Sequence, residues 1–230
     1  MDTPKERFDI VNSFLGFGDP HAPIWFVGLE EAGEWNEDPR KDEHMYRQYA
    51  KGYFHIAPGV ISLEAQKYGR RFTKVYDIMS KLVVIALNAP NLSDWKYYRD
   101  HLLFSEGGHT LQANLYPLGK PSLRSWPEKY RMLFGMDSAE RYYKSAPKDR
   151  FQLLGTAHAK YRPRITICFG RKGWDSFQRI FGLGEEFGDE IDGCRIYPSN
   201  VVLTPFFSYP LMPQRIIDAL GQHLRSLLAD

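Results

Sequence analysis

The chain has 230 residues, a formal net charge of +2 and a hydrophobic fraction of 43%, which is the composition of one ordinary globular domain. No apolar run approaches the roughly 20 residues of a membrane-spanning helix, and the N-terminus lacks the apolar core of a signal peptide, so we expect no membrane partner. Two cysteines occur, Cys168 and Cys194, without a CxxC spacing; this excludes a cysteine-based zinc or iron–sulfur centre and predicts a cytoplasmic protein with no metal and no cofactor.

Helix and strand signals alternate from end to end, which predicts a single α/β domain over residues 1–230. In chain order we expect a helix over 4–15, a strand over 24–28, a long polar and aromatic loop over 29–69, a helix over 72–87, a helix from a Ser93 cap to about 103, and a strand over 109–114. There follow a loop over 116–127, helices over 128–161 broken at Gly135 and Pro147, a strand over 164–169, a helix over 173–181, strands over 194–197 and 201–204, and a helix over 213–228. Apolar strands joined through helices predict a three-layer α/β/α sandwich with a mostly parallel central sheet.

The first predicted strand, Ile24–Gly28, carries the clearest functional signal. It is apolar throughout, as expected of a strand buried on both faces, and carboxylates follow its glycine at once. In an open α/β sheet, ligands bind beyond the carboxyl ends of the strands. Glu30 would therefore stand at a ligand-binding edge, where a carboxylate can orient a water molecule or stabilise a cationic sugar.

Two further loops are predicted to open on the same edge. Asn114 ends one strand, and Phe206-Phe207-Ser208 follows the last one. An amide side chain presents donors and an acceptor in one plane, which matches the edge of a nucleobase, and aromatic rings offer a base a stacking surface. An acid, an amide and an aromatic–serine pair would thus converge at one site.

This set of loops resembles the uracil-DNA glycosylase superfamily over roughly residues 24–228. In that family the first strand is followed by Gly-x-(Asp, Asn or Ala)-Pro, whose third residue activates water or stabilises the sugar cation, and Gly28-Leu29-Glu30 is similar to it. Leu-Gln-Ala-Asn114 is similar to the second motif, whose asparagine reads uracil. The third motif, His-Pro-Ser, has its place taken by Phe206-Phe207-Ser208.

The resemblance implies a monomeric DNA glycosylase that excises uracil or a related deaminated base from single-stranded or damaged DNA by hydrolysis of the N-glycosidic bond. Glu30 would be the catalytic residue, and Gly28, Leu29 and Asn114 would bind the base. Phe54, with Tyr53 as the alternative, would stack on the base. The loop over residues 206–208 would hold the DNA strand.

The chain departs from the family pattern at two positions. Glu31 replaces the proline of the first motif, and Phe206 replaces the histidine that would stabilise negative charge on the leaving base. Loss of one such electrostatic stabiliser commonly costs about 10²–10³ in rate. A non-catalytic nucleic-acid or nucleobase-binding module on the same fold is therefore the first alternative.

The second alternative is a metal-dependent small-molecule hydrolase. Its ligands would come from the acidic loop after the first strand, namely Glu30, Glu31, Glu34, Asp38 and His44. The spacing of these residues matches no known ligand signature, so they equally fit a solvated acidic loop.

Basic residues also gather in predicted loops. Lys120 lies near Arg124, and Lys160 near Arg162 and Arg164. Such clusters could follow a DNA backbone, and they equally fit an ordinary solvated surface.

Overall fold

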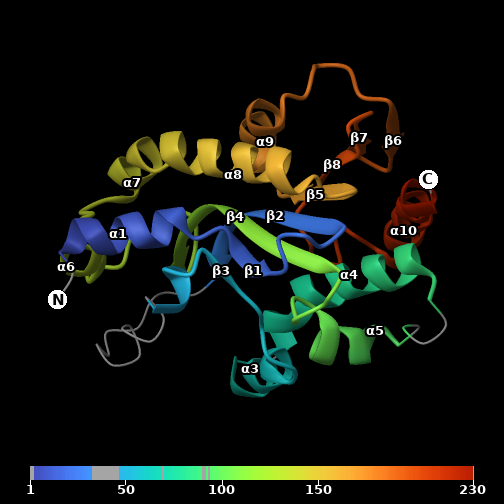
Figure 1. The fold of residues 1–230 in the computed structure, drawn as a ribbon, viewed down its shortest axis with the longest axis horizontal. Helices are drawn as coiled ribbons and strands as arrows, with labels where there is room; N and C mark the ends of the chain where they lie inside the picture. The colour runs from blue at the N-terminus through green and yellow to red at the C-terminus, as the bar shows by residue number, and fades with distance from the viewer. Residues whose placement is uncertain (1–2, 33–46, 69, 90–91, 93, 230) are drawn as a thin grey trace.

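The computed structural model describes residues 3–32, 47–68, 70–89, 92 and 94–229. In this part of the chain one sheet has the strand order β3-β1-β4-β2-β5-β8-β7-β6 (Figure 1). The strands are β1 (Gly16–Gly18), β2 (Ile24–Ala32), β3 (Tyr53–Phe54), β4 (Thr110–Lys120), β5 (Ile165–Phe169), β6 (Asp189–Ile191), β7 (Cys194–Ile196) and β8 (Val201–Thr204). The α-helices are α1 (Pro4–Ser13), α3 (Val60–Tyr68), α4 (Arg70–Leu87), α5 (Trp95–Tyr97), α6 (Tyr130–Phe134), α7 (Ala139–Ser145), α8 (Pro147–Tyr161), α9 (Trp174–Phe181) and α10 (Gln214–Ala229), with a π-helix η2 (Tyr98–Leu102) and a 3₁₀ helix η3 (Arg171–Gly173).

The sheet is mixed, so the expectation of a mostly parallel sheet was wrong. The four central strands β4, β2, β5 and β8 pair in parallel, whereas β1 with β4, β8 with β7, and β7 with β6 pair antiparallel. The edge strands β3 and β6, and β1 next to β3, were not predicted from sequence and have only two or three residues each. Such short strands show no alternating pattern, and it is tertiary pairing that creates them.

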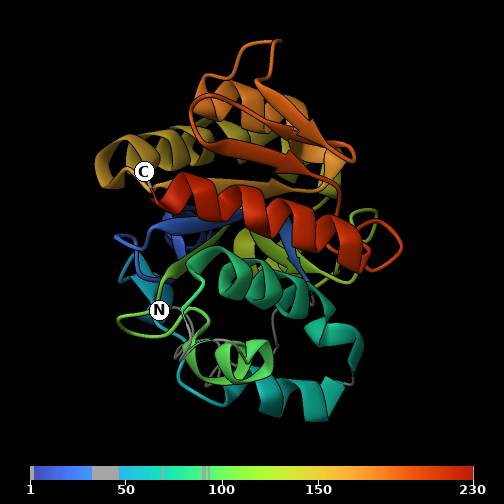
Figure 2. The ribbon, with the colours of Figure 1, turned by 90° about the vertical axis from the view of Figure 1, so that its right-hand side faces the viewer.

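Helices cover both faces of the sheet, which gives the three-layer α/β/α arrangement. Figure 2 looks onto the face covered by α4 and α10, whose apolar residues pack on strand residues such as Phe26 and Ile167. The opposite face packs against α8 and α9 through Trp25 and Val27. A third apolar cluster joins α1, α6 and α7 at one end of the sheet.

Local signals explain where several helices begin. Thr3 and Glu6 form a capping box around the start of α1, with Pro4 in its first turn. The predicted cap at Ser93 lies outside the described residues; Asp94 caps α5 instead, because its carboxylate accepts hydrogen bonds from the backbone of Lys96 and Tyr97.

The expected loops after Gly28 and Asn114 are partly strand. Strand β2 runs on to Ala32 and β4 to Lys120, and the two pair along this extension, with a register shift between Glu30 and Ala32. The prolines and the glycine that indicated a loop over 116–127 thus lie partly in an irregular stretch of strand pairing. The extension brings the end of β4 beside Glu30.

The connections of the central strands change face between β2 and β5. After β2 the next elements in the chain are β3, α3 and α4, the last of which covers one face of the sheet, whereas β5 is followed by α9 on the other face (Figure 1). Where adjacent parallel strands send their connections to opposite faces, a ligand-binding crevice forms beyond the carboxyl ends. A ligand-binding site is therefore expected beyond the carboxyl ends of β2 and β5.

Candidate functional site

Most of the residues predicted for the site lie at this carboxyl edge. Gly28, Leu29 and Glu30 belong to the end of β2, and Asn114 stands opposite Gly28 on β4. The segment 206–208 follows β8. The fold therefore brings together the ends of strands that are far apart in sequence, whereas Phe54 on β3 is two strands away from Asn114.

The pair formed by Gly28 and Asn114 leaves a polar atom without a partner. A methyl group at Gly28 would lie 2.6 Å from Oδ1 of Asn114 and 2.7 Å from Cζ of Phe169. The Asn114 side chain is buried, and its Oδ1 has no hydrogen-bond partner among the described residues. Burying such an oxygen unpaired costs about 1–3 kcal/mol, so a ligand or water that supplies a donor would be favoured there.

Replacing Gly28 with alanine is expected to lower the free energy of unfolding by about 1–3 kcal/mol, because the new Cβ overlaps packed side-chain atoms. Urea denaturation measures this change. Gly184→Ala is the matched control, since the nearest atom to a Cβ there is 3.9 Å away. Equal stability of the two variants would contradict the tight contact between Gly28 and Asn114.

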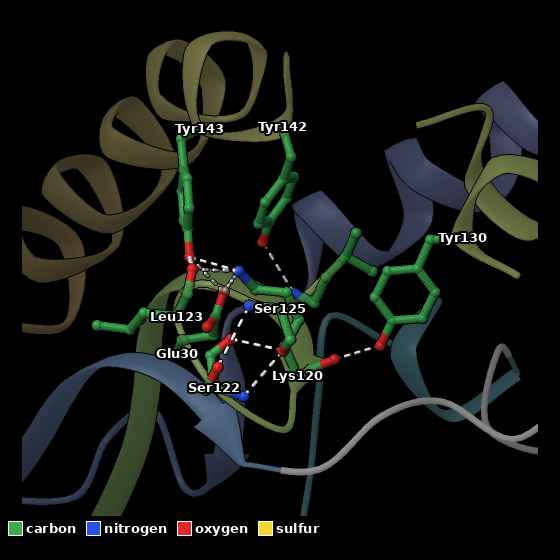
Figure 3. A network of polar contacts seen from close by, with 10 residues as sticks. Glu30, Lys120, Ser122, Leu123, Ser125, Tyr130, Tyr142 and Tyr143 are labelled. Atoms are coloured by element: carbon green, nitrogen blue, oxygen red, sulfur yellow. Dashed lines mark hydrogen bonds and ion pairs between the residues drawn. The ribbon is translucent and has the colours of Figure 1, made fainter. Parts of the chain in front are cut away.

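Glu30 belongs to a buried polar network (Figure 3). Nζ of Lys120 lies 3.2 Å from Oε1 of Glu30, 2.5 Å from the hydroxyl of Tyr143 and 3.2 Å from the carbonyl oxygen of Leu123. The three ammonium protons therefore each have an acceptor. The hydroxyl of Tyr143 lies 3.3 Å from Oε1 of Glu30 and 3.1 Å from the Leu123 carbonyl oxygen. The ion pair is buried, since the side chains of Lys120 and Glu30 are 0% and 5% exposed.

Burial changes the acid–base properties of this network. It raises the pKa of Glu30 to about 7, while the charge and hydrogen bond of Lys120 and the hydroxyl of Tyr143 oppose the rise. Near neutral pH the carboxyl group is therefore divided between its two protonation states, a range suited to proton exchange with substrate or water. Burial, with a further contribution from Glu30, also raises the pKa of Tyr143, so that its hydroxyl stays protonated.

Neighbouring tyrosines fix the end of β4 that carries Lys120. The backbone N–H of Leu118 donates to the hydroxyl of Tyr142 at 2.9 Å, and the hydroxyl of Tyr130 donates to the carbonyl of Gly119 (Figure 3).

Two members of this network differ from the expectations from sequence. Tyr143 could not be predicted, because no local pattern links a tyrosine on α7 to β2. Lys120 was expected in an exposed basic cluster, which is wrong, since Lys120 is 2% exposed.

Two residues assigned to base binding pack elsewhere. The Leu29 side chain lies against Gly170 and Gly173, where an added Cβ would come within 2.9 and 2.6 Å of it. Strand alternation puts it on the opposite face from the Asn114 side chain. Phe54 packs against Phe14, Phe17 and Tyr49, with ring centroids 5.4, 5.1 and 6.0 Å away.

A small cavity next to Asn114 is lined by Phe17 and Tyr49 together with Gln112 and Arg150. Phe54 does not line it. Phe14, Phe17 and Tyr49 are thus the aromatic residues that share a cavity with the predicted base reader, and none of them was predicted for this role.

The loop after β8 contains both exposed and buried residues. Phe206 is 47% exposed, whereas Phe207 is fully buried and stacks on Phe169 with ring centroids 4.7 Å apart. The Phe207 ring therefore belongs to the core, and Phe206 is the ring of this loop that lies at the surface. Ser208 is half-buried, and its carbonyl accepts the backbone N–H groups of Leu211 and Met212.

Only part of the expected basic side chains lie at the carboxyl edge. Lys160, Arg162 and Arg164 precede β5, at the amino end of the parallel strands and away from the candidate site. Arg124, which follows β4, and Arg171 and Lys172, which follow β5, are exposed at the carboxyl edge. A polyanion approaching this edge would meet these cations.

The acidic loop proposed for a metal falls largely outside the described residues, which include neither the side chain of Glu31 nor Glu34, Asp38 and His44. Within the part that is described, no group of three histidine, cysteine, aspartate or glutamate side chains is arranged to hold a metal ion.

The described part of the chain contains no helix whose length and apolarity would let it cross a membrane.

Comparison with known proteins found no match: no protein-family model matches the chain, and no curated protein matches it.

Proposed function

We propose that this protein recognises a deaminated base in DNA and hydrolyses its N-glycosidic bond, as the resemblance to uracil-DNA glycosylases implies. Asn114 reads the edge of the base, and Glu30 orients water or stabilises the oxocarbenium-like sugar. DNA as the partner and a monomeric state are part of the same proposal.

The observation that carries this proposal is the unpaired amide oxygen of Asn114 at the carboxyl edge of the parallel strands. Deamination turns a ring nitrogen from an acceptor into an N–H donor beside an oxo group. A carboxamide is complementary to that edge, since its oxygen accepts and its nitrogen donates in one plane. Oδ1 of Asn114, buried and without a partner among the described residues, has the capacity that the new N–H requires.

Three other features support the proposal. Glu30 lies two residues beyond Gly28, the partner of Asn114, and its pKa of about 7 supplies a carboxylate at and above neutral pH. Arg171 and Lys172 are exposed at the same edge, where they can neutralise phosphates. Exposed Phe206 gives a flipped or single-stranded base a ring to stack on.

A non-catalytic base-binding module is the second candidate, and one observation favours it. Oε1 of Glu30 is already engaged by Lys120 and Tyr143, and the side chain is 5% exposed. A carboxylate held in this way can be a structural partner of a buried cation. The metal-dependent hydrolase has no comparable support among the described residues.

Base release from labelled oligonucleotides distinguishes the candidates. The panel contains uracil, hypoxanthine, xanthine and mismatched thymine, each in single and double strands. Glu30→Gln is expected to lower the rate of release by about 10²–10³, because it removes the charge that stabilises the transition state. Glu106→Gln, an exposed residue before the amino end of β4, is the control. Binding without release would select the non-catalytic module, and full activity of Glu30→Gln would remove Glu30 from the mechanism.

The pH dependence follows from the pKa of Glu30. Because the ionised form is required, kcat/KM should rise with pH around a midpoint near 7 and fall at lower pH. Lys120→Met removes a cation that opposes the rise in this pKa, so the midpoint should move to higher pH. A profile that is flat between pH 6 and 8 would show that Glu30 does not titrate in the reaction.

A further inference from the structure

We infer that Gln112 is a second base-reading residue, which selects bases carrying a second exocyclic oxygen next to the edge read by Asn114. This inference rests on the proposed function and adds the chemical class of the preferred base. An imide edge, with an N–H between two oxo groups, occurs in uracil and xanthine. Hypoxanthine has one oxo group beside its N–H.

First, Gln112 lies two residues before Asn114 on β4. Successive side chains of a strand alternate between faces, so the two amides share one face of the sheet, roughly 7 Å apart along the strand. Gln112 is paired in register with Phe17 on one side and Phe26 on the other. Both Gln112 and Asn114 line the same cavity.

The second step is that both side chains are buried and each amide oxygen is without a partner. Gln112 and Asn114 are 7% and 6% exposed, and Oε1 and Oδ1 have no hydrogen-bond partner among the described residues. An unpaired buried amide oxygen is uncommon in native proteins, and two amide side chains that line one cavity indicate a ligand with at least two polar positions.

The third step is the size and lining of the cavity. It has room for about one water-sized group, which is the size of a single exocyclic oxygen and too small for a whole ring. Phe17 and Tyr49 supply aromatic walls. Arg150 lines it as well, but its guanidinium N–H groups donate to backbone carbonyls. The Gln112 amide can donate to such an oxygen when its NH₂ end, rather than the unpaired Oε1, is turned towards the cavity.

Two free ligands that differ by one oxygen atom test the inference. Uracil and pyrimidin-4(3H)-one share the N3–H and the 4-oxo group; only uracil has the second oxygen at C2 and, with it, a proton on N1, and the comparison with Gln112→Leu isolates the contribution of that oxygen. Dissociation constants measured by NMR titration of the full chain are expected to favour uracil by at least tenfold. Gln112→Leu should abolish that preference and leave the affinity for pyrimidin-4(3H)-one unchanged, and Gln112→Met serves if the leucine variant does not fold. Gln222→Leu, an exposed amide on α10, is the control and should keep the preference.

Base release measured in parallel separates this inference from the proposed function. A preference for uracil that depends on Gln112, without release from DNA, would support the second reader and refute the hydrolase. Release from DNA with an unchanged uracil preference in Gln112→Leu would support the hydrolase and overturn the second reader. Absence of binding of either free ligand by the wild-type protein would also overturn it.

Discussion

Replacing Arg150 with methionine is expected to lower the free energy of unfolding by about 3–5 kcal/mol, among the largest single-site effects in this protein. Arg150 on α8 is 1% exposed. Its guanidinium donates to the carbonyl oxygens of Asn12, Phe14, Leu15 and Asn114. One side chain therefore ties the C-terminal end of α1 and the residues after it to the strand that carries the predicted base reader.

The size of the effect follows from what the substitution leaves behind. Methionine fills much of the volume but donates no hydrogen bond, so buried carbonyl oxygens would be left unpaired. Among the described residues no carboxylate pairs with Arg150, and burial lowers its pKa to about 10, which keeps it charged at neutral pH. Carbonyl dipoles, including those at the negative end of α1, thus stabilise the charge.

Urea denaturation of Arg150→Met, Arg150→Lys and Lys148→Met measures the effect. Lysine keeps the charge but has three donors at one nitrogen, so it cannot bridge the same carbonyls, and we expect a loss close to that of methionine. Lys148 is exposed on the same helix, and its substitution should be nearly neutral. Stability of Arg150→Met within about 1 kcal/mol of the wild type would mean that water replaces the guanidinium without cost.

The buried pair of Glu30 and Lys120 should give the second large effect. At pH 8, where Glu30 is ionised, Lys120→Met is expected to cost about 3–5 kcal/mol, because it leaves the carboxylate buried without a counter-charge. Glu30→Gln is expected to cost less, about 1–2 kcal/mol, because a pKa of about 7 means that the neutral form of Glu30 is already accessible. The double variant should recover much of that loss, since both charges are then gone. A double-mutant cycle measures the coupling, and the exposed pair Lys5 and Asp9, 3.9 Å apart, is the control that should show none.

The loss of stability caused by Lys120→Met should depend on pH and be greater at higher pH. Without the lysine the pKa of Glu30 rises above its value of about 7, so the carboxyl is neutral at pH 6 and little charge is buried. At pH 8 the folded protein must bury an unpaired carboxylate or hold a proton that the unfolded chain releases. Lys120→Met should therefore lose more stability at pH 8 than at pH 6. Equal losses at both values, or additive single effects, would contradict the buried ion pair.

The wild-type protein should show a related dependence of its own. The pKa of Glu30 is raised from 4.5 to about 7 on folding, so between these values the folded state binds more protons than the unfolded chain. The contribution of this group to stability is therefore largest at acidic pH and is lost as the pH rises through 7.

Several features could be predicted from sequence because they depend on neighbours along the chain. The start of α1 follows from Thr3, Pro4 and Glu6, which satisfy the first turn by themselves. The five residues of β5 are all buried, as their unbroken apolar run predicted. The break at Gly135 is also local, because this residue ends α6 with a φ of 65°, which glycine adopts readily. Placement of Glu30 and Asn114 at one edge followed from the direction of parallel strands.

Other features were decided only when distant segments met. Gln112 and Tyr49 line one cavity because β4 packs beside the segment before β3, and Tyr143 reaches Glu30 from a helix 113 residues further along the chain. The mixed sheet depends in part on β1 and β6, antiparallel strands too short to have a pattern of their own. Lys120 looked like a surface residue in sequence, yet the irregular extension of β4 alongside β2 buries it against Glu30. Periodicity and capping are properties of one segment and can be read along the chain, whereas burial of a charge and the choice of its partner depend on which segments pack together.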